Sequence, residues 1–128
     1  ETSHIRQNIE DLVERTQALG GIFDYEGKAE RLTEVRRELE QPDVWNDPER
    51  AQSLGRERAG LEQVVETLDT LSSGLSDAGE LLELAAEEKD EATVREVERD
   101  LAEHERALAA LQFRRIFSGE LEAKNAFL

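Results

Sequence analysis

The sequence describes a small and strongly acidic protein. It has 128 residues, of which 31 are acidic and 16 are basic, so the formal net charge is −15. One domain fits this length, and the absence of cysteine excludes disulfides, thiolate metal sites and thiol nucleophiles. The acidity argues against direct binding to nucleic acid, which needs clustered Lys and Arg. No apolar run reaches the roughly 20 residues that span a bilayer, so we expect a cytoplasmic protein without membrane contact.

Two helices are expected at the start of the chain. Apolar residues at three- and four-residue spacings predict a helix over residues 3–19. Ser3 can act as its N-cap, and the two glycines that follow Leu19 supply a stop. The same spacing predicts a second helix over residues 24–40, which ends before Pro42.

The only two prolines of the chain bracket a short turn. Pro42 and Pro48 enclose five residues, and Asp47 can cap a helix that has Pro48 in its first turn. Val44 and Trp45 are apolar within this turn. We expect both side chains to fold inward as a plug, and an anchor for a partner protein is the alternative.

The third segment carries a leucine heptad repeat. The repeated residues are Leu54, Leu61, Leu68, Leu75 and Leu82. The residue three positions after each leucine is also apolar from the second heptad onward, which is the pattern of a coiled coil. The repeat predicts a helix over residues 48–88, about 60 Å long at 1.5 Å per residue. We expect Gly74 and Gly79 to weaken it by up to about 1 kcal/mol each and to permit a bend.

A turn and a fourth helix complete the predicted hairpin. Lys89 and Asp90 form the expected turn, and Asp90 can cap a helix over residues 91–116. Apolar residues of this helix also follow heptad rows, in which His104 takes a packing position on the seam. The sequence therefore predicts an all-α fold, a small helical bundle with a long antiparallel coiled-coil hairpin.

The helical pattern breaks at Ser118. Residues 120–128 show no helical period. We therefore expect a helical domain over residues 1–117 and the start of a separate core domain, extended or disordered, over residues 118–128.

Acidic residues concentrate in the outer half of the predicted hairpin. Ten acidic residues and one basic residue lie between Glu62 and Glu91. A solvated, self-repelling helix surface is one interpretation, and a docking surface for a basic protein is the other. The candidate docking residues are Glu83, Glu87, Glu88, Asp90 and Glu91.

No residue pattern indicates catalysis, a cofactor or a metal. The two histidines, His4 and His104, lie far apart, and neither belongs to an H-E-x-x-H motif. Carboxylate pairs such as Glu83 and Glu87 lie on an exposed helix face, whereas acid–base chemistry needs a pocket that separates their pKa values. We therefore expect that the chain is not an enzyme and binds no cofactor or metal.

Three stretches of sequence resemble the bacterial class I peptide chain release factors. Two are residues 24–32 and residues 38–52, which include the specific run Pro-Asp-Val-Trp-Asn at 42–46. The third is residues 111–120, which resembles the family's junction between a helical N-terminal domain and a ribosome-binding core. The resemblance covers essentially the whole chain, and it favours members that read UGA and UAA codons over those that read UAG and UAA.

The resemblance implies a role in translation termination. Family members carry a Gly-Gly-Gln loop for peptide release and a Ser-Pro-Phe tripeptide for codon reading; neither occurs here. Both are expected downstream of Leu128. The family's first domain projects toward the ribosomal stalk base and the GTPase-associated region, and it has been linked to the GTPase release factor. The resemblance thus implies a ribosome- and partner-interaction module. The turn at Lys89 and Asp90 lets the leucine rows pair within one molecule, so we expect a monomer. A coiled coil that self-associates through its leucine rows is the alternative.

Overall fold

The chain folds entirely into helices over the part that the structure describes. A computed structural model describes residues 1–117, and the expectation for residues 118–128 lies outside this range. These residues contain no strand, which confirms the all-α prediction. The elements are α1 (Ser3–Ile22), α2 (Tyr25–Leu39), the 3₁₀ helix η1 (Pro42–Asn46), α3 (Pro48–Glu88) and α4 (Glu91–Phe117).

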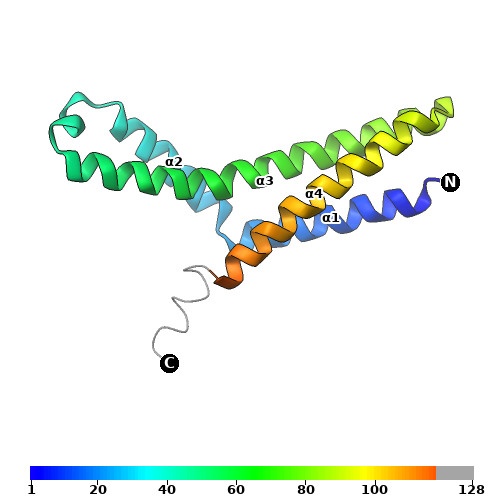
Figure 1. Cartoon of the computed structure of the whole chain (residues 1–128), viewed down its shortest axis with the longest axis horizontal. Coiled ribbons are helices and arrows are strands. Elements are labelled where there is room, and N and C mark those ends of the chain that lie inside the picture. The colour runs from blue at the N-terminus through cyan, green and yellow to red at the C-terminus, as the bar shows by residue number, and fades with distance from the viewer. Residues whose placement is uncertain (118–128) are drawn as a thin grey trace.

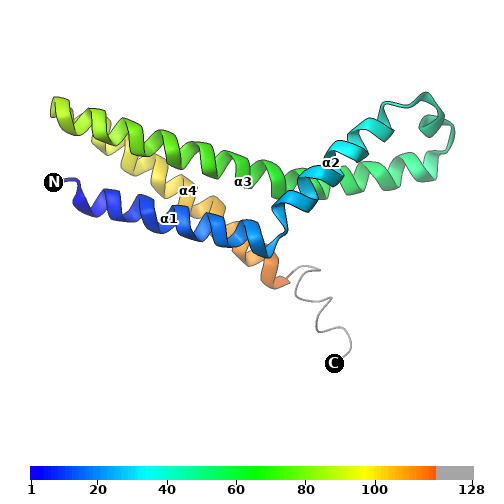
Figure 2. The same cartoon turned by 180° about the vertical axis from the view of Figure 1, so that it is seen from behind.

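The long helix α3 is the spine of the molecule (Figure 1). Its C-terminal half packs against α1 and α4, and these three segments form what we call the bundle. Its N-terminal half packs against α2 and η1, and these segments form the arm. The view from behind shows the arm and the bundle extending in opposite directions from the middle of α3 (Figure 2).

The antiparallel hairpin of α3 and α4 is present, but it occupies only part of α3. Helix α4 has 27 residues against 41 in α3, so it returns along the C-terminal part of its partner and leaves the N-terminal part uncovered. In addition, α1 lies against both helices, and the outer half of the hairpin is therefore part of a three-helix bundle. The sequence repeat predicted the hairpin, although it did not indicate which helix would cover each half of α3.

Each half of α3 has its own apolar core. The core of the bundle contains Leu68, Leu75 and Leu82 of the heptad row, together with buried residues of α1 and α4. Leu54 belongs to the core of the arm, and Leu61 is half-buried against the same cluster. The leucine row therefore faces the two apolar cores, as the heptad pattern predicted, although Leu61 is only half-buried.

Two helix starts and one turn follow the sequence prediction. The Asp47 carboxylate accepts a hydrogen bond from the Arg50 amide at 3.2 Å, with Pro48 in the first turn of α3. The Asp90 carboxylate accepts from the Thr93 amide at 3.1 Å and caps α4. Lys89 adopts the left-handed conformation (φ 57°) that ends α3.

The first helix begins at Ser3, as predicted, but its N-cap and its C-terminal end differ from the prediction. Thr2, not Ser3, is the N-cap, and its side chain makes no capping hydrogen bond. At the other end α1 runs through the two glycines to Ile22. Burial explains this continuation, because Phe23 immediately after the helix is fully buried and outweighs the low helix propensity of glycine. The chain turns instead at Asp24, which has a left-handed backbone (φ 54°) and caps α2.

The turn between the two prolines buries only one of its two apolar side chains. Val44 is 4% exposed and packs in the core of the arm, as predicted. Trp45 is 63% exposed, so the expectation that it folds inward is wrong. A 3₁₀ helix has three residues per turn, so neighbouring side chains project about 120° apart and only one of them can face the core.

Gly74 accommodates the ring of His104 where α3 and α4 meet. A Cβ atom at position 74 would lie 2.5 Å from Cε1 and 2.6 Å from Nε2 of the half-buried His104 ring. Nothing lies within 4 Å of the corresponding position at Gly79. Gly74 therefore has a packing role that its effect on helix propensity does not reveal.

Candidate functional site

The five candidate docking residues lie at the outer end of the bundle. Glu83, Glu87 and Glu88 belong to the last two turns of α3, while Asp90 and Glu91 lie at the start of α4. The N-terminus of the chain lies beside them, because α1 begins at the same end of the bundle (Figure 1). The structure thus brings the five residues together, but their carboxylates differ in the contacts that they make within the chain.

Glu83 joins two helices. Its carboxylate accepts hydrogen bonds from Nε of Arg6 at 2.6 Å and from Nη2 of Arg6 at 3.3 Å. The hydrogen bond from Arg6 lowers the pKa of Glu83. Glu83 therefore holds α1 against α3, and its charge is compensated within the chain.

Asp90 and Glu91 also have contacts within the chain. The Asp90 carboxylate accepts a hydrogen bond from the Thr93 hydroxyl at 2.6 Å in addition to the amide bond that caps α4. Hydrogen bonds from Thr93 lower the pKa of Asp90. Glu91 lies 3.9 Å from the guanidinium of Arg95, one turn further along α4. These contacts are exposed, so the Glu91 pair is weak.

Glu87 and Glu88 are the candidates that remain available for a partner. Both are exposed, and their carboxylates make no ion pair or hydrogen bond with another residue in the range 1–117. Leu84, which is 57% exposed, and Leu81 lie on the same stretch of α3. The sequence analysis did not find these two residues, although they are the two leucines of this helix that fall outside the heptad rows.

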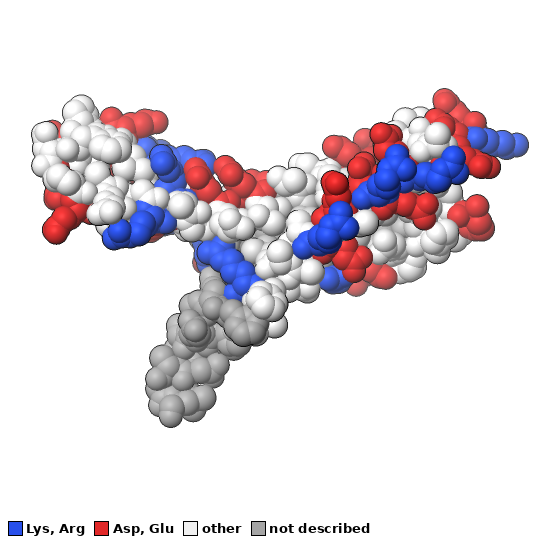
Figure 3. All heavy atoms as spheres, in the orientation of Figure 1, with Lys and Arg blue, Asp and Glu red and all other residues white. Residues whose placement is uncertain are grey.

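Basic residues interrupt the acidic surface that the sequence predicts. Arg95, Arg99 and Arg106 are exposed on α4, and their spacings of four and seven residues place them on one helix face. Figure 3 shows a line of basic side chains across α4, bordered by acidic ones. Counting charge along residues 62–91 missed this line, because α4 packs beside α3 and brings its own charges to the same surface. The bundle is therefore mixed in charge rather than uniformly acidic.

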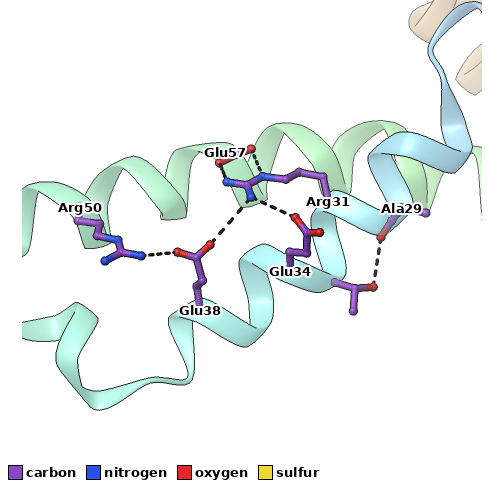
Figure 4. Close-up of polar contacts among 7 residues, drawn as sticks. Ala29, Arg31, Glu34, Glu38, Arg50 and Glu57 are labelled. Atoms are coloured by element: carbon purple, nitrogen blue, oxygen red, sulfur yellow. Dashed lines mark hydrogen bonds and ion pairs between the residues drawn. The ribbon is translucent and has the colours of Figure 1, made fainter.

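Ion pairs connect the two helices of the arm (Figure 4). The guanidinium of Arg31 on α2 donates to both carboxylate oxygens of Glu57 on α3, at 2.6 and 2.9 Å. On the same side, Glu38 accepts a hydrogen bond from Arg50 at 2.6 Å. The bond from Arg31 lowers the pKa of Glu57. This pairing also explains why Glu57, three positions after Leu54, is charged, whereas the residue three positions after each later leucine of the repeat is apolar.

The described residues offer surfaces for contact rather than an enclosed reaction site. Over residues 1–117, no three side chains of the His, Asp or Glu type converge as a metal site requires. In the same range, no helix combines the length and the apolar character needed to cross a bilayer. The hollow at the outer end of the bundle is open and is lined by His4, Ala85, Lys89, Asp90 and Glu98, among others. Such a surface can recognise charge and shape on another macromolecule.

Comparison with known proteins gives consistent matches. A family model described as the PCRF domain matches residues 28–128. The chain is 55% identical to peptide chain release factor 2 of Aliivibrio fischeri, 56% to that of Shewanella baltica and 55% to that of Pasteurella multocida. Each alignment covers 100% of this chain and 35% of the relative, so the chain spans about a third of their length. The chain therefore belongs to the PCRF domain family.

Proposed function

We propose that the chain is the N-terminal domain of a peptide chain release factor that directs termination at UGA and UAA codons. The identity of about 55% over all 128 residues to proteins named peptide chain release factor 2 supports this role. The sequence contains neither Gly-Gly-Gln nor Ser-Pro-Phe. In this proposal, codon reading and peptide release belong to other parts of a longer protein, and the present domain is not itself an enzyme.

The domain acts as a ribosome- and partner-interaction module in the cytoplasm. The single observation that carries this assignment is the exposed pair Glu87 and Glu88 beside Leu84, at the far end of a long helix. Carboxylates attract basic proteins and repel the phosphates of RNA. We assign this end of the bundle to docking at the ribosomal stalk base and the GTPase-associated region, with the GTPase release factor as a second partner.

Association kinetics of the full release factor test the assignment. Replacement of Glu87 and Glu88 by glutamine should slow association with ribosomes about threefold at low salt, and the difference should shrink as salt is added. A matched control replaces Glu10 and Glu14, two exposed carboxylates of α1, and removes the same charge elsewhere. Equal rates for the docking and control variants at low salt would contradict the docking site.

A release assay separates the domain's role from that of the whole protein. The 128-residue chain should release no peptide from ribosomes stalled at a UGA codon. It should nevertheless compete with a full-length release factor for binding to those ribosomes. Peptide release by the chain alone would disprove the proposal that catalysis lies elsewhere.

The alternative of a self-associating coiled coil has less support. Leu68, Leu75 and Leu82 are buried within one chain, so this part of the heptad row is not available to a second copy. We therefore propose a monomer. Sedimentation should give the mass of one chain, 14.5 kDa, independent of dilution.

A further inference from the structure

The outer end of the arm presents an exposed tryptophan that the proposed function does not use. Trp45 is the only tryptophan of the chain and is 63% exposed. Its indole Nε1–H donates a hydrogen bond to the Leu39 carbonyl at 2.9 Å. The polar edge of the ring is thus satisfied within the chain, while most of its apolar surface stays in solvent. Exposed tryptophans of this kind are enriched among the residues that dominate binding energy at interfaces.

The turn that carries Trp45 is held in place on both sides. Val44 is buried in the core of the arm, and its carbonyl accepts a hydrogen bond from the Asp47 amide at 3.0 Å. Pro42 and Pro48 restrict the backbone at the two ends of the turn. A ring fixed in advance loses little conformational entropy when a partner binds.

The turn that carries Trp45 has charged residues of one sign, between Arg37 at the end of α2 and Arg50, which is paired with Glu38. Residues 40–49 contain four acidic residues and no basic one. Asp47 caps α3, whereas Glu40, Asp43 and Glu49 are exposed and their carboxylates have no partner in the range 1–117. Figure 3 shows acidic side chains at the border of the largely uncharged outer end of the arm, with basic side chains further inward.

We propose that the outer end of the arm is a second docking surface, which binds a positively charged segment of a partner protein by stacking an arginine on Trp45. The guanidinium is attracted to the face of an indole ring, and the flanking carboxylates add to that attraction. The same carboxylates disfavour stacking by a base of RNA, whose phosphates they repel, and they disfavour contact with a second copy of this chain.

Fluorescence of Trp45 tests the proposal directly, because no other tryptophan contributes to the emission. The probe is a capped peptide of alternating arginine and glycine, titrated into the 128-residue chain at low salt. The emission of Trp45 should change saturably, and a peptide with citrulline in place of arginine should have no such effect. Free N-acetyltryptophanamide corrects for collisional quenching by the peptide.

Variants identify the contacts, with affinity measured by calorimetry. Trp45→Ala should weaken peptide binding about threefold to tenfold, and Asp43→Asn with Glu49→Gln should weaken it by a similar factor. Glu10→Gln with Glu14→Gln is the matched control, because it removes the same charge from two exposed positions of α1, outside the arm, and should leave the Trp45 response unchanged. Trp45→Phe keeps an aromatic face on which an arginine can stack. Circular dichroism checks the fold of each variant. If Trp45→Ala does not fold, the charge variants still decide the question.

Several results would overturn the proposal. One is peptide binding that leaves the Trp45 emission unchanged, and another is equal affinity for the wild-type chain and a folded Trp45→Ala variant. An absence of binding at low salt would also count against it. A saturable emission change with single-stranded oligouridine, but not with the arginine peptide, would assign the surface to RNA instead.

Discussion

Replacement of Gly74 by alanine should destabilise the protein, although helix propensity alone predicts the opposite. Alanine is about 1 kcal/mol better than glycine in a helix interior. At position 74, however, the new methyl group would lie 2.5 Å from the ring of His104. Overpacking of this kind costs about 1–3 kcal/mol. The net change in the free energy of unfolding should therefore lie between about 0 and 2 kcal/mol of destabilisation.

Gly79 provides the matched control, because it lies in the same helix and an added Cβ atom would meet nothing within 4 Å. Gly79→Ala should therefore stabilise the protein by up to about 1 kcal/mol. Urea unfolding followed by far-ultraviolet circular dichroism measures both changes. The two variants should differ by about 1–3 kcal/mol in the free energy of unfolding.

A double-mutant cycle isolates the contact with His104. In a His104→Ala background the space beside position 74 is empty, so Gly74→Ala should become stabilising, like Gly79→Ala. If Gly74→Ala stabilises the protein while His104 is present, the ring leaves the space beside position 74 at less than the cost of overpacking, and the reasoning fails.

Other predictions concern burial, capping and pH. Leu101→Ala removes a side chain that is 2% exposed and should lower the free energy of unfolding by about 2–5 kcal/mol, whereas Leu84→Ala at the surface should change it by less than about 0.5 kcal/mol, as urea unfolding can measure. Asp90→Ala removes the cap of α4, so amide hydrogen exchange in the first turn of that helix should become faster. The lowered pKa values of Glu57 and Glu83 mean that their stabilising effect is complete above the ordinary value of 4.5 and is lost as pH falls further. Thermal melting below that pH should show a smaller loss of stability in a Glu83→Gln variant than in the wild type; an equal loss would contradict the assignment.

Local patterns in the sequence predicted the long helices and most of their ends. The heptad row depends on neighbours within α3, and Asp47 and Asp90 cap helices through amides three residues away. These interactions are close in sequence, so the order of residues reveals them. The end of α1 was missed because burial of Phe23 in the bundle keeps the helix intact through two glycines.

The candidate site was predicted less completely, because its composition depends on contacts between distant segments. Arg6 and Glu83 are 77 residues apart, and no local pattern pairs them. The same limit applies to Trp45, since its apolar character suggested burial while the geometry of a single 3₁₀ turn decided its exposure. Sequence reasoning located the acidic end of the bundle, but it could not separate the carboxylates that support the fold from Glu87 and Glu88.

The continuity of α3 has a mechanical consequence. One helix of 41 residues, about 60 Å long, runs from the core of the arm into the core of the bundle. Within α3 (Pro48–Glu88) no loop separates the two cores, so the helix itself fixes their relative direction. A partner that binds the turn at Trp45 would therefore also fix the direction in which Glu87 and Glu88 point.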